Sequence, residues 1–392
     1  MKQQIEALGI AAAAQLLVLE RSRTSTAASR RRKILCIAAT ALCMISLQDR
    51  INTKRVTTFY PTQNMQIWDD DMFIKMFRFR REHLHEMLQA LNLDSSKSIL
   101  CGRQGRAQYF LADLCVMIVL RRMAFPCRFV DLVNVFGLPS HRICDIFHST
   151  IDLLYERYAH KLNQLKIWES HFPAFAKAMK EFGAPYDTLV GIFDGHDIDV
   201  CRPGGLGNLF SRLDQSELFA GGKASHTIKY LVAQFPKLNP NGMSASAGPF
   251  KGTAHDGRCL RESKWMEILQ EIADDQGTCF LLFGDAGFAV SKYIQAMVKG
   301  YGGYMTSESR AYNNLMSRIR IYIENDFARS ANEFSYFSYK NGLKIGGRRL
   351  HRAYEVSLLF RNVHNTFYGN QFTSALGFRL HISLADFLAM AD

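Results

Sequence analysis

Hydrophobic residues follow two different rhythms along the chain. Between residues 64 and 160 they recur at steps of three and four, which is the spacing of one face of an α-helix. The clearest set is Phe73, Phe77, Leu84, Met87, Leu88 and Leu91. From residue 186 onward, short apolar runs rich in β-branched and aromatic residues predict strands. They lie at 188–200, with a break at Asp194-Gly195 where the first strand is expected to end, and at 226–235 and 278–283. Helical spacing returns at 261–275 and 313–334.

Two further segments of this second half have less distinct patterns. Small residues crowd 242–257, which predicts a turn-rich connection, and 301–306 is a candidate strand. Strands that alternate with helices indicate an α/β domain whose mixed sheet is largely buried between helices. The preceding region lacks strand patterns, and we expect an all-helical domain there.

These patterns divide the chain into four parts. We expect a basic, partly disordered N-terminal segment, a helical domain, an α/β catalytic core, and a basic, helical C-terminal segment. Their predicted boundaries are 1–60, 61–180, 181–340 and 341–392.

One region of the helical domain, 129–155, resembles a helix-turn-helix. Gly137 is a good residue to end its first helix, and Ser140 is a plausible N-cap for the second. If this pair of helices reads DNA, His141 and Arg142 at the start of the second helix would face the groove. The alternative is an ordinary helical hairpin packed in a core.

Composition narrows the range of partners. The 392 residues carry a formal net charge of +12 and a pI of about 9.3, which favours a polyanion, either nucleic acid or a membrane surface. The nine cysteines are irregularly spaced without a CxxC motif, so we expect reduced thiols and no cysteine-rich zinc site. The apolar run 34–47 is too short to span a bilayer, and we expect a buried or partner-seeking helix there.

Two acids follow apolar runs in the α/β part. Asp194 comes before Gly195, and Asp285 lies between Gly284 and Gly287. Because ligand sites in open α/β sheets lie just beyond the ends of strands, we expect both acids at one edge of the sheet. The alternative for each is a simple turn, since Asp before Gly is common in turns.

A third acid comes from the helical pattern at 313–334. Glu324 borders the buried stripe of that helix, and Arg320, four residues earlier, can pair with it. Two Asp and one Glu supply hard oxygen ligands suited to Mg²⁺ or Mn²⁺. Such carboxylates can hold two metal ions for in-line displacement at phosphorus. The sequence therefore predicts a site with two divalent metal ions.

Four motifs occur one after another along the chain, and their order matters as much as their residues. They are "FDGHDIDVCRP", "AHDGRCLRES", "LFGDAGF" and "SRIRIYIENDFARSANEF". Together they resemble the catalytic core of Harbinger-type transposases and their domesticated nuclease relatives. The helix-turn-helix-like region and the segment 358–371 are also similar, so the likeness covers roughly 70–371. It implies an RNase H-like fold with a DDE motif formed by Asp194, Asp285 and Glu324. It further implies supporting roles for His255, Asp256 and Arg320.

The resemblance also implies partners. DNA would be the substrate, and a separate Myb-like DNA-binding protein would help to choose the target in the nucleus. The segment 317–352 holds eight Lys or Arg against three acids, so we expect Arg318 on a surface that binds the phosphate backbone. Lys223 and Lys229 are further candidate DNA contacts. No membrane is expected, and formation of a homo-oligomer stays open.

We therefore expect a metal-dependent nuclease that hydrolyses phosphodiesters and transfers strands. Its main rival is a domesticated relative that binds DNA or protein and cuts nothing. The intact acids count against that rival, and the few basic residues around Lys223 and Lys229 count for it. A phosphohydrolase acting on small phosphates is a third alternative, which would need a closed pocket in place of an open basic groove.

Overall fold

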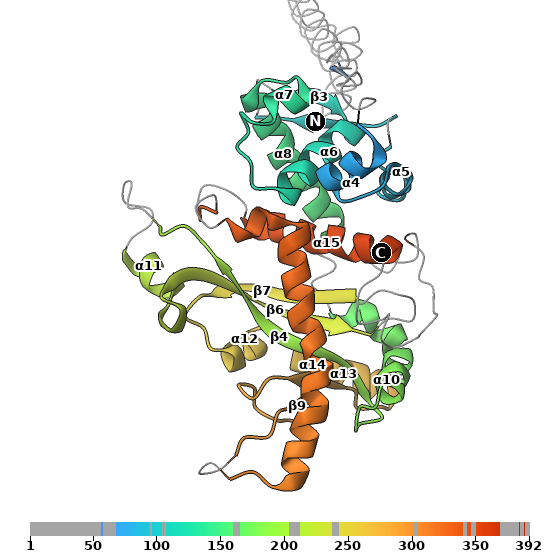
Figure 1. Ribbon diagram of the computed structural model, residues 1–392, viewed down its shortest axis with the longest axis vertical. Coiled ribbons are helices and arrows are strands. Elements are labelled where there is room, and N and C mark those ends of the chain that lie inside the picture. The colour runs from blue at the N-terminus through green and yellow to red at the C-terminus, as the bar shows by residue number, and fades with distance from the viewer. Residues whose placement is uncertain are drawn as a thin grey trace, which may run out of the picture.

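A computed structural model shows a helical domain at one end, a sheet domain at the other and one helix between them (Figure 1). It describes residues 56–57, 68–94, 96–103, 105, 107–159, 165–203, 212–236, 243–300, 304–339, 343–345, 350–368, 384 and 388. The predictions for the apolar run 34–47 and for nearly all of the basic segment 1–60 therefore lie outside the described residues.

The helical domain packs its helices around one largely buried helix. That helix, α6 (Ala112–Ala124), buries most of its side chains. The apolar set from Phe73 to Leu91 is buried as well, because α4 and α5 turn one face inward. Small strands, not anticipated from the sequence, pair beside these helices. The other elements are α4 (Asp70–Phe77), α5 (Arg81–Ala90), β1 (Val56–Thr57), β2 (Ser98–Cys101) and β3 (Gln108–Leu111).

The helix-turn-helix-like region contains a very short first helix, α7 (Val133–Phe136), followed by α8 (Ser140–Leu154). Gly137 ends α7 in the left-handed conformation with φ 66°, as predicted. The prediction of Ser140 as N-cap was wrong, because Pro139 occupies that position and Ser140 is the first helical residue. Proline fixes its own φ and prepares the chain to enter the helix.

The second domain contains a six-stranded mixed sheet with the order β5-β6-β4-β8-β9, in which β7 also pairs with β6 and β5 (Phe219–Ala220) is only two residues long. β6 is antiparallel to its neighbours β4 and β7, whereas β4, β8 and β9 are parallel. This mixed sheet, flanked by helices, is an RNase H-like core, and the predicted fold class is confirmed. The other strands are β4 (Leu189–Asp199), β6 (Ser225–Phe235), β7 (Met243–Lys251), β8 (Leu281–Gly284) and β9 (Ile294–Ala296).

Three strand predictions need correction. The turn expected at 242–257 is largely strand β7, whose serine and alanine side chains are small because a helix packs closely over them. β9 was not predicted. At 301–306, where a strand was expected, Tyr304 forms an isolated bridge, and 301–303 lie outside the described residues.

Helices cover both faces of the sheet. On one face, α10 (Phe172–Glu181) and α14 (Ser307–Glu333) pack against Leu189 and Ile192 of β4 and against Leu281 and Phe283 of β8. On the other face lie α12 (Asp256–Glu262) and α13 (Trp265–Gln276), with Trp265 packed edge to face on Phe193. Because β8 is covered on both sides, its run Leu281–Phe283 is apolar throughout. α10 falls within the range predicted for the helical domain but packs on β4.

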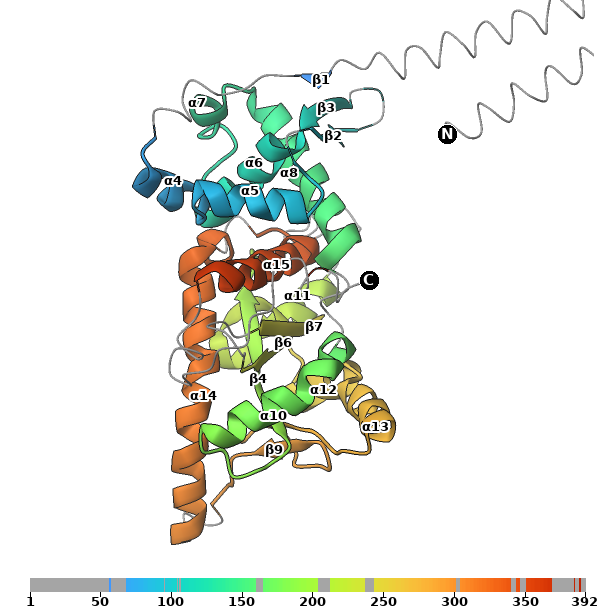
Figure 2. The same cartoon turned by 90° about the vertical axis from the view of Figure 1, so that its right-hand side faces the viewer.

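The helix α15 (Leu350–Tyr368) lies between the two domains (Figure 2). On the sheet side, the Asn362 side chain accepts from the amide of Ser244 and donates to its carbonyl, both at 3.0 Å. This satisfies a backbone position on the outer strand β7. On the other side, Arg352 pairs with Asp152 of α8 at 2.9 Å. α15 therefore ties the helical domain to the sheet.

Shorter elements complete the described part of the chain. They are η1 (Tyr155–Ala159), η2 (Leu165–His171), α11 (Arg212–Leu218), β5 (Phe219–Ala220), η3 (Gly221–Lys223) and η4 (Ser335–Ser338). Within the described residues, no helix has the length and apolarity needed to cross a membrane.

Candidate active site

Asp194 lies in the middle of β4, not at the end of a strand as predicted. The strand continues to Asp199 because it pairs with β6 along this whole stretch. Its parallel pairing with β8, however, stops at Ile192 opposite Phe283. Gly195 does not turn the chain; a Cβ there would lie 2.9 Å from Oδ1 of Asp256, so the glycine makes room for that carboxylate.

Asp285 follows the last residue of β8, as predicted. Its Oδ1 accepts a hydrogen bond from the amide of Gly287 at 2.6 Å. A Cβ on Gly284 would lie 2.7 Å from the Phe288 ring and 2.9 Å from the Phe193 ring. The two glycines thus have separate purposes, since Gly284 lets aromatic rings pack against the strand end and Gly287 holds the carboxylate. If the β4–β8 register is continued by two residues, Asp285 falls beside Asp194.

Glu324 reaches the same place from α14. The buried stripe of that helix, Met316, Ile319 and Ile323, is confirmed, and Glu324 is 54% exposed at its border. Arg320 joins Glu324 to Asp194: its Nη2 lies 2.7 Å from Glu324 Oε1 and 3.4 Å from Asp194 Oδ2. The guanidinium of Arg320 on α14 therefore contacts a carboxylate of its own helix and one of β4, whose Asp194 is 126 positions away from Arg320 in the sequence.

The electrostatics of Asp194 reflect this crowding. Burial is the main cause that raises the pKa of the Asp194 carboxyl, and the charges of Asp285 and Asp256 raise it further. The Gly195 amide and Arg320 lower it, but the net shift of the pKa is upward. A carboxylate that is desolvated and close to other acids gains from any nearby cation. In this structure the guanidinium of Arg320 supplies that positive charge.

A second group of charges lies on the other face of β4. Lys229 on β6 pairs with Asp256 at 3.0 Å and lies 3.8 Å from Asp197, and Lys223 pairs with Asp197 at 2.7 Å. Lys229 is only 13% exposed, whereas Lys223 is 59% exposed. Asp256 thus lies near the predicted site, in the field of Asp194. Lys229 is engaged with carboxylates, and Lys223 remains the more accessible of the two predicted DNA contacts.

The remaining predicted residues are spread over the molecule. His255 is exposed just before α12, and Arg318 is exposed on α14, two residues before Arg320. His141 and Arg142 lie in the first turn of α8 in the helical domain. That domain is separated from the sheet by α15 (Figure 2), so a protein surface that used both regions would have to extend past α15.

Two residues of the site had not been singled out from the sequence. His196 follows Asp194 by two positions and faces the same side of β4; burial lowers its pKa to about 4. Asp197 faces the side of Lys229. The available signal was the alternation in "DGHDID", which places Asp194, His196 and Ile198 on one face of a strand once the Asp-Gly pair is not taken as a turn.

The three predicted carboxylates are the groups of the site that could hold a divalent cation. Among the residues that the structure describes, no group of three or more His, Cys, Asp or Glu side chains is gathered closely enough to hold a metal ion. Nevertheless, two of the three predicted carboxylates already share one cationic group, Arg320. The oxygens are of the hard type that Mg²⁺ and Mn²⁺ prefer, so the residues fit such an ion chemically once Glu324 turns from the arginine.

The comparison with known families concerns this same part of the chain. Residues 193–361 match the family model of the DDE superfamily endonucleases. The matched segment runs from β4 into α15 and includes Asp194, Asp285 and Glu324. It supports a transposase-like nuclease, for which DNA is the implied substrate and divalent metal ions are the typical cofactors. No curated protein and no solved structure matches the chain.

Proposed function

We propose that this protein is a metal-dependent DNA endonuclease and transposase of Harbinger type. One observation carries the proposal. Inside a segment that matches the DDE endonucleases, Arg320 joins Asp194 to Glu324, and the charge of Asp285 acts on Asp194. In the proposal, these three carboxylates, from a central strand, a strand end and a long helix, form one site. This set of acids is the one the sequence predicted.

The three acids would hold two divalent ions, which supply charge neutralisation at the phosphate and lower the pKa of an attacking water. Asp194 is fixed in the centre of the sheet, and Asp285 is held by the Gly287 amide. Glu324 is exposed and rests on a helix, so it can rotate without moving the backbone. Rigid placement of the first two acids favours in-line attack, because phosphoryl transfer depends mainly on positioning and electrostatics.

In the proposed reaction a water molecule first attacks a phosphodiester. The oxygen to phosphorus bond forms on one side while the bond to the 3′-oxygen breaks on the other, which leaves a 3′-hydroxyl and a 5′-phosphate. That 3′-hydroxyl then attacks a phosphodiester of the target and transfers the strand. A net charge of +12 and Arg318, exposed on the same helix as Glu324, support binding of the phosphate backbone.

A nicking assay tests the proposal. Full-length protein is incubated with supercoiled plasmid in Mg²⁺ or Mn²⁺, and parallel samples contain EDTA. We expect Asp285→Asn to lower the nicking rate by more than about 100-fold, beyond the 10–100-fold typical of residues that only support a metal ligand. Asparagine keeps the oxygen that accepts from Gly287, so the fold should be retained.

The matched control is Asp187→Asn, which removes an acid that is 80% exposed and paired with Lys180 away from the site. It should nick like the wild type. Equal nicking by wild type and Asp285→Asn would contradict the proposal. If neither protein cuts while both bind DNA equally, the domesticated, non-cutting relative is the better description. The Myb-like partner, the nuclear location and any homo-oligomer stay predictions.

A further inference from the structure

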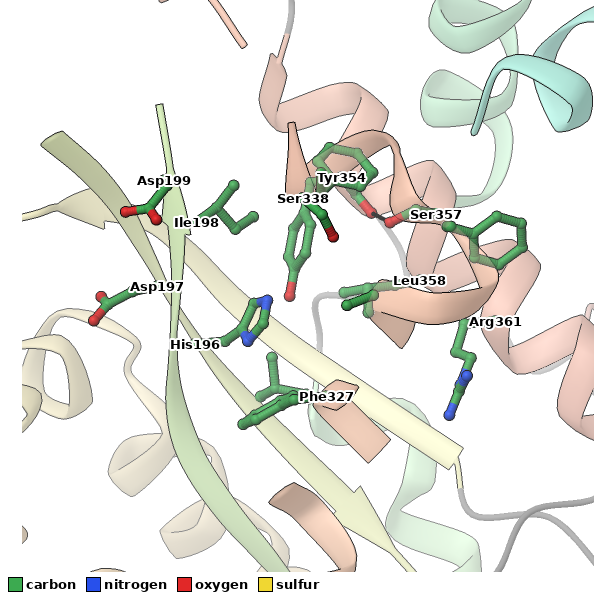
Figure 3. A pocket seen from close by; sticks show the side chains of 14 residues that line it. His196, Asp197, Ile198, Asp199, Phe327, Ser338, Tyr354, Ser357, Leu358 and Arg361 are labelled. Atoms are coloured by element: carbon green, nitrogen blue, oxygen red, sulfur yellow. Dashed lines mark hydrogen bonds between the residues drawn. The ribbon is translucent and has the colours of Figure 1, made fainter. Parts of the chain in front are cut away.

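A cavity of about 220 Å³ lies beside the candidate active site, between β4, α14, η4 and α15 (Figure 3). This volume is below the roughly 300–1,000 Å³ of pockets for drug-sized ligands. It corresponds to about seven waters at roughly 30 Å³ each. The cavity therefore suits one small ring system, and it reaches the surface at Ser338, whose side chain is exposed.

Flat side chains form its walls. The His196 ring lies 4.5 Å from the Phe327 ring and nearly parallel to the Tyr354 ring, with centroids 5.9 Å apart at 12°. Phe337, which also lines the cavity, stands edge-on to Tyr354 at 5.7 Å. Such surfaces favour a planar guest, because a flat ring buries most area when it stacks on another.

The charges around the cavity are already paired or point elsewhere. Arg361 is 1% exposed and bonded to Glu333 at 2.5 Å. Asp197 and Asp199 line one end through β4, but their carboxylates point away from the cavity (Figure 3). Among the described residues that line the cavity, no group of opposite charge is therefore left to receive a phosphate or a metal ion. The guest that fits is a neutral, planar heterocycle.

The cavity adjoins the carboxylates on two elements. His196 is two residues beyond Asp194 on β4, a rise of about 7 Å, and Phe327 is three residues beyond Glu324 on α14, a rise of about 4.5 Å. A phosphate bound at Asp194 and Glu324 would therefore place the base of a neighbouring nucleotide beside the part of the cavity that His196 and Phe327 line.

We propose that this cavity receives one DNA base, swung out of the helical stack, next to the phosphate at the active site. The proposal rests on the proposed function in that DNA must be bound there, and it adds a base-holding pocket to it. Enzymes that extrude a base stack it between aromatic or apolar side chains, and the energetic cost is least when that base is already unpaired. The aromatic walls of this cavity are suited to that role.

The test measures DNA affinity by fluorescence anisotropy in Ca²⁺, which is used to limit cutting. The two probes are nicked duplexes that differ only at the nucleotide beside the nick, which is an unpaired adenine in one and an abasic site in the other. We expect the wild type to bind the adenine probe at least about fivefold more tightly, because one stacked base is gained. Ala331→Phe, which fills the cavity from α14, should abolish this preference and leave binding of the abasic probe unchanged.

Two further variants keep the test sharp. Phe327→Ala removes one wall and should reduce the preference, whereas Ile321→Ala, on the same helix but 51% exposed, should retain it. If wild type and Ala331→Phe show the same preference, or if the wild type shows none, the base pocket is refuted. If the wild type binds neither probe, the proposed function fails as well. Loss of all DNA binding is thus distinguished from loss of the base preference alone.

Free adenosine distinguishes the source of the base. Competition by adenosine for the adenine probe in wild type, lost in Ala331→Phe, would show that the pocket also takes free nucleosides and would support a heterocycle site. A preference for adenine-bearing DNA without such competition would support a base presented only by bound DNA. A wild type whose nicking is lost in Asp285→Asn but which shows no base preference would leave the nuclease standing and overturn the pocket.

Discussion

Arg320 provides the most direct physical test of the site. Its guanidinium touches exposed Glu324 at 2.7 Å and Asp194, only 16% exposed, at 3.4 Å. Replacing Arg320 by Gln keeps a good helix former but removes the cation. Asp194 would then remain in the field of Asp285 and Asp256 without its compensating charge. We therefore expect Arg320→Gln to lower the free energy of unfolding.

The magnitude follows from the distances. Two unit charges 3.4 Å apart attract by about 5 kcal/mol at an effective dielectric of 20 and by about 1 kcal/mol in water. Because Arg320 is 27% exposed and Asp194 is 16% exposed, part of this attraction is screened. We expect the coupling between them to be about 1–3 kcal/mol. The pair with exposed Glu324 should contribute less, about 0–1 kcal/mol.

A double-mutant cycle measures these couplings. The unfolding free energies of wild type, Arg320→Gln, Asp194→Asn and the double variant are compared by urea titration at pH 7 in EDTA. A matched cycle uses Glu324→Gln in place of Asp194→Asn. If the Arg320–Asp194 cycle is additive within about 0.5 kcal/mol, or if the Glu324 cycle gives the larger coupling, the electrostatic account of the site is refuted.

Metal titration extends the same prediction. An ion that binds the folded state stabilises it by RT ln(1 + [L]/Kd). Arg320 competes for two of the carboxylates that would hold the ion, so Mg²⁺ should raise the unfolding temperature more in Arg320→Gln than in wild type. Asp285→Asn should reduce the effect in either background. An equal Mg²⁺ response in wild type and Arg320→Gln would show that Arg320 and the ion do not compete.

Three other substitutions test the surroundings of the site. Burial lowers the pKa of His196 to about 4 from 6.5. As the pH falls from 6.5 to 4, the unfolded state therefore takes up the proton first, and the free energy of unfolding of the wild type should fall by about 2–3 kcal/mol. The free energy of unfolding of His196→Gln should fall by less over the same range. A Cβ on Gly191 would lie 2.6 Å from the carbonyl oxygen of Gln234, so Gly191→Ala should destabilise by about 1–3 kcal/mol. Lys229→Met leaves Asp256 without its 3.0 Å partner and should destabilise by about 1–3 kcal/mol.

Each of these has a control and a clear contrary result. Urea titrations at several pH values give the free energy of unfolding of wild type and His196→Gln. The same dependence on pH in both proteins would contradict the prediction for His196. Gly257→Ala, with nothing within 4 Å of the added Cβ, should not destabilise. Lys223→Met, at a lysine 59% exposed, should cost less than Lys229→Met. If Lys229→Met weakens DNA binding without lowering the free energy of unfolding, Lys229 contacts DNA and does not stabilise the fold.

Local patterns in the sequence were sufficient for much of the molecule. Periodic apolar residues predicted the buried faces of α5 and α14, because a helix face depends only on residues three and four apart. The apolar run before Asp285 predicted β8, since a strand covered on both faces needs apolar side chains throughout. Glu324 was predicted on the border of the buried stripe of α14 because its position around the helix also follows from residues three and four apart. These features depend on short-range geometry.

Where the sequence misled, the cause was a neighbour distant along the chain. Asp194-Gly195 has the composition of a turn, yet β6 pairs with both residues and Asp256 fills the space that a side chain at 195 would need. The small residues of β7 also suggested a turn. They form a strand because α15 packs on them and Asn362 satisfies the backbone of Ser244.

The sequence by itself determined that Asp285 follows a buried strand and that Glu324 borders the buried face of a long helix. Only the tertiary structure decided that Arg320 holds two of the acidic residues of the site together, that Lys229 is engaged by Asp256 and Asp197, and that a cavity opens beside them. The reason is physical: the type of element follows from residues close in sequence, whereas charge pairing and cavity shape depend on how β4, α14 and α15 pack in space.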